Sequence, residues 1–425
     1  MSEEEKLECS FCGKEQNQVK KLIAGSSAYI CCDCVDLCAS ILKQEEIDEK
    51  EKTEKNQPKT TIENDLLNPR KIREYLDQYV IGQDYAKMVV SVAVSNHYKR
   101  ISKHDHINDV EISKSNCLFV GPSGSGKTYL AQSVARFLDV PCIISDATSM
   151  TESGYVGADV DSIISNLVIA AGYDIKKAER GIVFIDEIDK KAKRESASGN
   201  RDVSGEGVQQ GLLKMLEGCD VRVPANGAKK NSNQDMITVN TKDILFVLGG
   251  AFVGLDKIVQ KRLNKKTSSV GFGADVTKNK NEEMVKYLEQ VESEDLIEFG
   301  LIPELVGRIP VIAHFHELSE EQLIEVLTQP KNSITKQFSK LFCLDKIDLE
   351  FTEEALSEIA RVARKKKVGA RGLRAIIERR LVKTQYDLAD LREQGVCKIL
   401  VNKNVIENNE EPEKIYLETL PSGEN

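Results

Sequence analysis

Short apolar runs along this chain alternate with segments in which apolar residues recur every three or four positions. The runs lie at Asn116–Val120, Cys142–Ile144, Gly181–Ile185 and Ile244–Leu248, and segments with helical spacing include Thr128–Leu138 and Ile163–Ala171. Continuous apolar strands separated by helices are typical of a parallel sheet with helices on both faces. The pattern therefore predicts the fold class α/β, with a parallel sheet covered by helices.

The flanking segments have other patterns. Asn68-Pro69 followed by KIREYLDQYV predicts a capped helix start, and Asp84–Arg100 has helical spacing. Beyond His316, the segments Leu318–Phe338 and Thr352–Leu391 read mainly as helices. They predict a smaller, mainly helical C-terminal domain.

A chain of 425 residues is long enough for two or three domains. We expect a cysteine-rich module at 1–45, a flexible linker at 46–65, a large α/β domain at 66–316, a small domain at 317–405 and a loose acidic tail at 406–425. The linker is charged and nearly free of large apolar residues, as in flexible segments. The tail is acidic and polar, which is typical of poorly ordered termini.

Charge narrows the class of partner. Lys and Arg number 59 against 68 Asp and Glu, a net charge of −9, which argues against nucleic acid or an anionic membrane as the main partner. No apolar run approaches the roughly 18 residues that cross a bilayer. The N-terminus, MSEEEKLECS, is acidic and lacks the apolar region of a secretory signal. We therefore expect a cytoplasmic protein with reduced thiols.

Six of the 11 cysteines lie in the first 38 residues. Cys9-x2-Cys12 and Cys31-x2-Cys34 are separated by 18 residues, a spacing typical of zinc sites. Four thiolates suit a closed, tetrahedral structural Zn²⁺ site, and in so small a module the metal supplies most of the folding energy. Cys32 and Cys38 are spare; Cys32 could compete with its neighbour Cys31, although the paired spacing favours Cys31.

The segment Gly121–Thr128, GPSGSGKT, fits the phosphate-binding P-loop pattern and has the strand before it and the helix after it that the pattern requires. That context argues against a chance match in a glycine-rich turn. Its glycines let backbone N–H groups approach a phosphate, and the helix N-terminus favours an anion. Lys127 can reach the β- and γ-phosphates of ATP, and Thr128 can ligate Mg²⁺. The full set of expected phosphate-binding residues is Gly121, Pro122, Ser123, Gly124, Ser125, Gly126, Lys127 and Thr128.

Two carboxylates follow the apolar run GIVFI. Asp186 is expected at the carboxyl end of a central strand, where ligands bind in open α/β sheets. There it can hold the Mg²⁺ water shell, and Glu187 can polarise the attacking water as general base. The alternative is a pair of solvated acids, which the preceding strand and the upstream P-loop make less plausible.

Four motifs together resemble the ClpX family of AAA+ unfoldases, which feed proteins to the ClpP peptidase. They are the P-loop, IDEID at Ile185–Asp189, RDVSGEGVQQ at Arg201–Gln210 and GARGLR at Gly369–Arg374. The resemblance runs from the cysteine cluster to about Val401. It implies an ATPase that recognises, unfolds and threads protein substrates, with no peptidase activity of its own.

The resemblance also assigns roles around the ATP. Arg308, in LIPELVGRIP, corresponds to an arginine finger that reaches a neighbouring subunit's nucleotide, which implies a homohexameric ring. Arg371 takes the sensor-2 position, and Val80 and Ile81 cover the adenine, although such an apolar pair could equally be core. Tyr129, next to the P-loop, is placed in the same site. Gly249 to Phe252 stand where a first sensor would be, and no sensor residue is assigned there.

Substrate and partner contacts come from the same resemblance. Tyr155 and Val156, in GYVG, correspond to the axial pore loop that grips an extended chain, and Arg201 lies near a second pore loop. Val270, Gly271 and Phe272 correspond to the tripeptide that docks on ClpP. Their apolar side chains within a polar run are typical of a partner site.

One stretch departs from the family. Ala228-Lys229-Lys230 stands where the family's substrate-entry loop commonly carries Arg-Lys-His, which puts the preferred degradation tags in doubt.

The resemblance implies that the zinc module dimerises and binds substrates and adaptors.

Two other functions are compatible with an AAA+ chain: a nucleic-acid remodeller that binds through the zinc module, and a non-catalytic ATP-binding scaffold. The acidic charge and the apolar loops argue against the first. Intact Lys127, Asp186, Glu187, Arg308 and Arg371 argue against the second.

Overall fold

The computed structural model describes residues 8–13, 15, 19–25, 28–32, 34–35, 67–102, 112–150, 161–193, 203–224, 236–267 and 287–416. Tyr155, Val156, Arg201, Ala228–Lys230 and Val270–Phe272 lie outside these residues, as does the linker at 46–65, so the expectations for them stay predictions. The chain forms two compact units, Met1–Thr61 and Ile62–Asn425. Each unit is described by itself.

In the first unit, strands β1 (Leu22–Ala24) and β2 (Tyr29–Cys31) form an antiparallel hairpin. Leu22 pairs with Cys31 across it. Cys31 is thereby fixed at the end of a strand and is fully buried.

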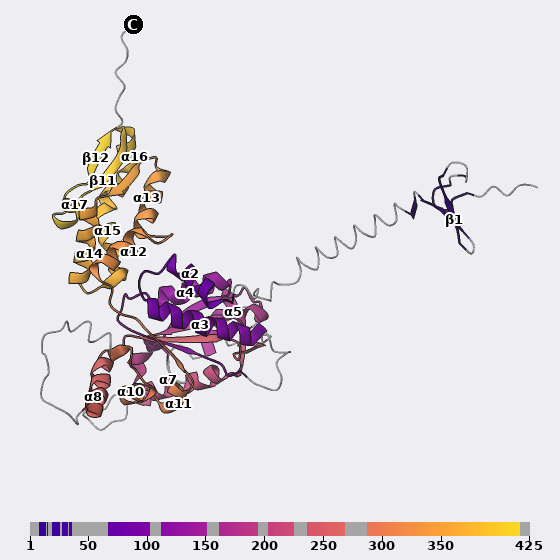
Figure 1. The fold of residues 1–425 in the computed structure, drawn as a ribbon. Coiled ribbons are helices and arrows are strands. Elements are labelled where there is room, and N and C mark those ends of the chain that lie inside the picture. Colours follow the sequence, from indigo (N-terminus) through magenta and orange to yellow (C-terminus); the bar gives the residue numbers. More distant parts are fainter. Residues whose placement is uncertain are drawn as a thin grey trace, which may run out of the picture. The chain divides into compact units, whose positions relative to one another are not determined.

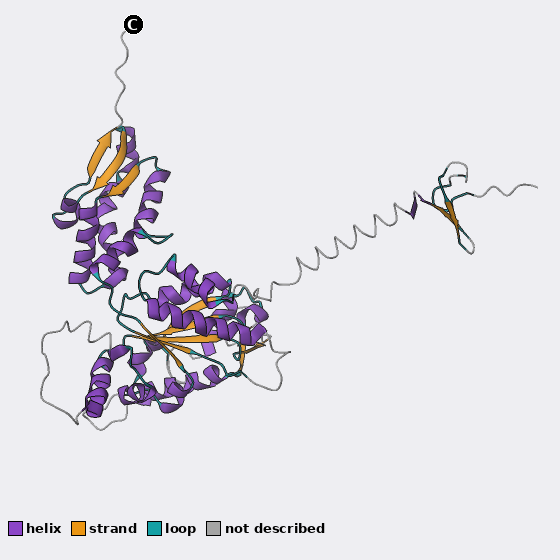
Figure 2. Cartoon of the chain, in the orientation of Figure 1, coloured by secondary structure: helices purple, strands orange, loops and turns teal. Residues whose placement is uncertain are grey.

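The second unit is built on a five-stranded sheet in the order β4-β5-β8-β3-β9 (Figure 2). Its strands are β3 (Cys117–Val120), β4 (Cys142–Asp146), β5 (Ile182–Asp186), β8 (Leu245–Gly250) and β9 (Val311–His314). All neighbouring strands run parallel, which confirms the predicted parallel sheet.

Apolar side chains of this sheet point alternately into two cores. In β5, Val183 and Ile185 join one core while Ile182 and Phe184 join the other. Helices α2 (Pro69–Asp77), α3 (Asp84–Ser102) and α4 (Lys127–Leu138) supply the second core, and α5 (Asp161–Ala170), α7 (Val203–Glu217) and α8 (Leu255–Thr267) supply the first. Both faces of the sheet are covered (Figure 2), which is why its strands read as continuous apolar runs.

A side-chain cap sets the start of α2. Asn68 caps α2, because its Oδ1 accepts a hydrogen bond from the Arg70 N–H at 3.0 Å, as the sequence predicts. The remaining elements of the large domain are η2 (Ala147–Ser149), α6 (Ile175–Ala178), η3 (Ile188–Lys191), the antiparallel hairpin β6 (Asp220–Pro224) with β7 (Met236–Asn240), α10 (Ser293–Phe299) and α11 (Pro303–Gly307). Ala228–Lys230, the predicted entry-loop residues, fall between β6 and β7 in the sequence.

The C-terminal domain has its own core and more strand than expected. Its helices are α12 (Glu320–Thr328), α13 (Ile334–Leu344), α14 (Glu353–Lys365), α15 (Gly369–Tyr386), α16 (Leu388–Glu393) and α17 (Lys403–Glu407) (Figure 1). It also carries a three-stranded sheet of β10 (Asp348–Phe351), β11 (Val396–Val401) and β12 (Glu413–Tyr416).

The sequence reading missed this sheet, and one boundary it set was wrong. The loose tail does not begin at 406, because α17 continues past that residue and β12 pairs with β11. β10 and β12 each carry charged residues at half their positions, so neither resembles a buried strand. Among the described helices, none combines the length and apolarity needed to span a bilayer.

Candidate nucleotide site and metal centre

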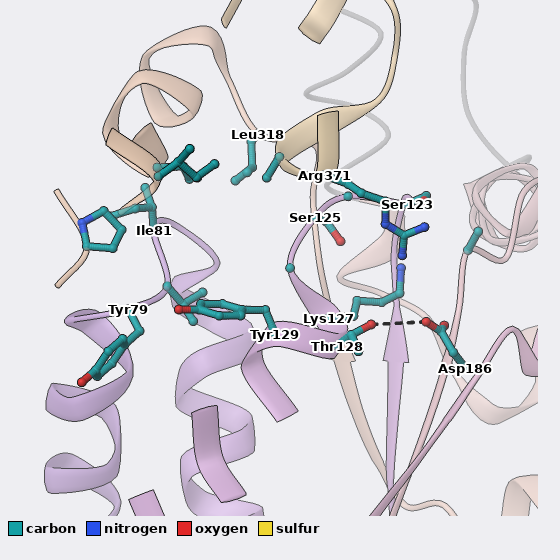
Figure 3. A pocket seen from close by; sticks show the side chains of 18 of the residues that line it. Tyr79, Ile81, Ser123, Ser125, Lys127, Thr128, Tyr129, Asp186, Leu318 and Arg371 are labelled. Carbon is teal, nitrogen blue, oxygen red and sulfur yellow. Dashed lines mark hydrogen bonds between the residues drawn. The ribbon is translucent and has the colours of Figure 1, made fainter. Parts of the chain in front are cut away.

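A cavity of about 490 Å³ lies at the carboxyl edge of the central sheet and is lined on one side by the C-terminal domain (Figure 3). Most of the predicted nucleotide residues line it: Val80, Ile81, Ser123, Gly124, Ser125, Gly126, Lys127, Thr128, Tyr129, Asp186, Glu187 and Arg371. Gly121 and Pro122 belong to the loop but do not line the cavity. The structure thus brings together residues that are nearly 300 positions apart in the sequence.

The P-loop connects β3 to α4 and packs closely against its surroundings at Gly124. Gly126 caps α4 in a left-handed conformation, with φ 98°. At Gly124, φ is 78° and a Cβ would lie 2.7 Å from the carbonyl oxygen of Val368 in the C-terminal domain. Only glycine combines that conformation with so close an approach. The loop is therefore packed against the C-terminal domain, and the Ala370 N–H donates to the Gly124 carbonyl at 3.2 Å.

Lys127 is buried beneath the loop. Its Nζ donates to the carbonyl oxygens of Gly121 at 2.6 Å and Pro122 at 2.9 Å. Burial lowers the pKa of the Lys127 ammonium below its usual value, while Asp186 and Asp189 oppose that shift. Arg371 lies close enough to lower the same pKa, and Figure 3 shows both cationic groups facing one space. Two neighbouring cations in a partly buried cavity favour an anion such as a polyphosphate.

Thr128 and Asp186 meet at the other side of the loop. The Thr128 hydroxyl donates to Asp186 Oδ2 at 3.3 Å, and the Glu187 N–H donates to Asp186 Oδ1 at 2.9 Å. Glu187 has φ 58°, a strained conformation for a residue with a side chain, directly after β5. A hydroxyl and a carboxylate are the oxygen ligands that Mg²⁺ takes beside nucleotide phosphates, so this pair fits the expected metal.

The end of β8 explains why no first sensor is found. A Cβ at Gly249 would lie 2.6 Å from the Phe184 ring and 3.3 Å from Asp186 Oδ1, so no side chain fits there. Asp189 occupies the neighbouring space instead. It is 4 % exposed and accepts from the Ala251 N–H at 3.3 Å.

Several lining residues were not predicted. They are Tyr79, Asp189, Lys190 and Ala251 of the large domain, and Leu318, Val326, Pro330, Asn332, Ile334, Gln337 and Ala370 of the C-terminal domain. The apolar members from α12 and α13 could be read from the sequence only as core positions of amphipathic helices. Their place against the ATP pocket depends on how the two domains meet.

Arg308 lies away from this cavity. It follows α11, and its Nη2 contacts Glu217 Oε1 at 2.7 Å while its side chain is 55 % exposed. An exposed ion pair of this kind contributes little to stability, about 0–1 kcal/mol. Arg308 therefore does not act on the nucleotide bound by its own chain in this arrangement.

Four cysteine sulfurs of the first unit converge. The Sγ atoms of Cys9, Cys12, Cys31 and Cys34 all lie within 4.8 Å of one another. Cys9 and Cys34 are 4.0 Å apart, and Cys12 and Cys31 are 3.7 Å apart. Tetrahedral zinc with Zn–S bonds of about 2.3 Å places its sulfurs about 3.8 Å apart, so the four fit. Cys31, not the adjacent Cys32, belongs to the cluster; Cys38 lies outside the described residues.

The P-loop, the carboxylates after β5 and the arginine supplied by a small C-terminal domain define a AAA+ ATPase. Family models agree: the AAA domain (Cdc48 subfamily) matches residues 112–312, the ClpX C4-type zinc finger matches 7–44, and the C-terminal, D2-small domain of ClpB protein matches 318–390. The ATP-dependent Clp protease ATP-binding subunit ClpX of Treponema denticola is 46% identical over 413 residues, which cover 97% of this chain and 96% of that protein. The chain belongs to the ClpX family. It is accordingly an ATPase with ATP, Mg²⁺ and Zn²⁺ as cofactors.

Proposed function

We propose that this chain works in the cytoplasm as a homohexameric unfoldase that recognises tagged or unfolded proteins, alone or through adaptors, and threads them into the ClpP peptidase. The observation that carries the proposal is the shared pocket, in which Lys127, Asp186 and Glu187 of the large domain face Arg371 of the C-terminal domain. A nucleotide there contacts both domains, so its hydrolysis changes contacts on both sides. That is what a motor requires.

Within the pocket each group has a chemical role. Lys127 and Arg371 hold the phosphates and stabilise the negative charge that builds on the γ-phosphoryl oxygens. Thr128 and Asp186 hold Mg²⁺, and Glu187 accepts a proton from the attacking water. Ile81 and Tyr129 lie on the side of the cavity away from these charges (Figure 3). With Val80, which also lines the cavity, they provide an apolar surface for the adenine.

The exposed position of Arg308 supports a ring. An arginine finger that serves a neighbouring subunit must lie on the outside of its own chain, and Arg308 is ion-paired there with Glu217. Engaging a neighbour's γ-phosphate would exchange the Glu217 carboxylate for a phosphate oxygen. Each of six sites would then need two chains for full activity.

The other partner contacts rest on the sequence. Tyr155 and Val156 would grip the substrate in the pore, with Arg201 near a second loop, and Val270–Phe272 would dock on ClpP. Ala228–Lys230 would form the entry loop, at the place where the family commonly carries Arg-Lys-His.

The decisive experiment is ATP-dependent degradation of a stable, tagged fluorescent protein, with and without the ClpP of the same organism. With this chain and ATP but no ClpP, the fluorescence should fall while the polypeptide stays intact. The polypeptide should disappear only when ClpP is added as well. Tyr155→Ala should retain ATP turnover and lose unfolding. Deleting Val270–Phe272 should retain unfolding and lose degradation. Degradation without ClpP, or unfolding unchanged by Tyr155→Ala, would contradict the proposal.

A further inference from the structure

The side-chain amide of Gln83 joins the P-loop to the segment that enters the C-terminal domain. Its Nε2 donates to the Ser125 carbonyl at 3.2 Å and to the His316 carbonyl at 2.8 Å, and its Oε1 accepts from the His316 N–H at 3.0 Å. Gln83 is 1 % exposed. An amide group has two N–H donors and one carbonyl, so every part of it is engaged.

His316 belongs to the short connection between the two domains. The preceding Phe315 still continues the central sheet, because its N–H donates to the Val120 carbonyl at 2.7 Å. Ser319 already caps α12 of the C-terminal domain. Residues 315–318 therefore connect the two domains. Gln83 bonds to both the N–H and the carbonyl of His316 within this link.

The backbone at this point is held in an unusual conformation. Gly82 has φ 62° and Gln83 has φ 57°, a region that residues with side chains rarely occupy. A Cβ at Gly82 would lie 2.7 Å from Gln322 Nε2, in the first turn of α12. A strained conformation persists only where its surroundings fix it, and here the P-loop, the link and α12 all do so.

The contact with Ser125 reaches the phosphate-binding surface directly. A trans peptide group points its C=O and the next residue's N–H in opposite directions. The bond from Gln83 to the Ser125 carbonyl therefore sets the direction of the Gly126 N–H, at the start of α4. That N–H is one of the free donors at a helix N-terminus that bind phosphate.

We propose that Gln83 is a positioning residue that transmits nucleotide binding from the P-loop to the interdomain link. When phosphate draws the Gly126 N–H toward it, the Ser125 carbonyl turns with the same peptide plane. The Gln83 amide follows, and it carries the His316 backbone with it. The proposal rests on ATP binding in the P-loop and is independent of any substrate, ring or peptidase partner.

Hydrogen exchange of the full chain, followed by mass spectrometry, tests this inference with MgADP, which stays chemically unchanged during labelling. Two peptides report: one covering the P-loop at 121–130 and one covering the link at 312–320. In the unmodified protein, saturating MgADP should slow exchange in both. In Gln83→Asn, which keeps an amide but is one methylene too short, the P-loop should stay protected while the link loses its response.

Gln132→Asn is the matched control, because Gln132 is exposed on α4, and it should behave like the unmodified protein. Gln83→Met, which keeps the length and removes the polar groups, is the second variant and should reproduce Gln83→Asn even if one of the two folds poorly. A link that still responds to MgADP in the Gln83 variants would overturn the proposal. Equal loss of protection in both peptides would also overturn it, because Gln83 would then merely support the P-loop.

Discussion

The Thr128 hydroxyl and the Asp186 carboxylate lie 3.3 Å apart, although 58 positions separate them in the sequence. The first residue lies in the first turn of α4 and the second ends β5, so the fold of the sheet and its helices brings these two oxygen groups together. Glu187 follows in a left-handed conformation, which turns its side chain away from the direction that β5 would give it. This geometry is consistent with the proposed division of roles, in which Thr128 and Asp186 hold the metal and Glu187 takes the proton.

Glu187→Gln should bind MgATP with nearly unchanged affinity and lose at least about 100-fold in turnover, the usual contribution of a general base. The amide keeps the shape but cannot accept the proton from water. Calorimetric titration with MgATP and a steady-state phosphate assay measure the two effects. Turnover equal to that of the unmodified protein would assign the base elsewhere. Asp186→Asn should instead weaken Mg²⁺ binding, because a charged metal ligand is removed. Turnover should then need a higher Mg²⁺ concentration.

Gly124→Ala should weaken MgATP binding by about tenfold or more, equivalent to about 1.4 kcal/mol. The added Cβ would meet the Val368 carbonyl at 2.7 Å, so either the P-loop or the start of α15 must move. Gly254→Ala is the control, because Gly254 also has a positive φ, 97°, but its Cβ would meet nothing within 4 Å among the described residues. It should lose some thermal stability and keep its nucleotide affinity. Equal affinities in the two variants would show that the contact with Val368 is unimportant.

Cys31→Ser should lose bound zinc, whereas Cys32→Ser should keep one zinc per chain. The reason is that Cys31, and not its neighbour, faces Cys9, Cys12 and Cys34. Metal content measured by atomic emission after gel filtration distinguishes the two variants. Basal ATP turnover should stay the same in both, because the cysteines and the nucleotide pocket belong to different compact units. The opposite zinc contents would place Cys32 in the site.

Acid should destabilise the protein partly through His97. Burial, followed by the charges of Arg100 and Lys114, lowers the pKa of His97 to about 3. Its Nε2–H donates to the Asp243 carbonyl at 3.0 Å, which leaves Nδ1 bare and buried with no described partner. Between pH 6.5 and about 3, the unfolded chain therefore binds one more proton than the folded chain, and stability falls as the pH falls.

His97→Gln removes the group that takes up a proton in the unfolded chain. It keeps an N–H group that can donate to the Asp243 carbonyl. Denaturant unfolding at pH 7.0 and pH 5.5 should show a smaller loss of stability in the variant, by up to about 1.4 kcal/mol for each pH unit below 6.5. Comparing the two proteins cancels the effect of the other titrating groups. An identical pH dependence would mean that His97 is protonated in the folded state.

Much of the ATP site was predictable from sequence because its chemistry is local. The P-loop, the strand before it and the pair Asp186–Glu187 each occupy one continuous segment with a strong pattern. β10 and β12 were missed because they are short and charged, so neither has the apolar run that revealed β5. Val326 and Ile334 were missed for another reason: an apolar residue on an amphipathic helix looks the same whether it faces a core or a ligand. The role of Gln83 was not predicted, because its link to His316 joins residues 233 positions apart, which no local pattern records.

The two halves of the nucleotide pocket differ in ways that bear on inhibitor design. The phosphate half is built from glycine backbone and close contacts, such as that between Gly124 and Val368, which leave no room for a side chain at Gly124. The base half is lined by side chains from a second domain, among them Leu318, Val326 and Ile334. A compound that fills the base half would bind only one interdomain arrangement. It would therefore contact both domains at once and hold them in the arrangement that it fits.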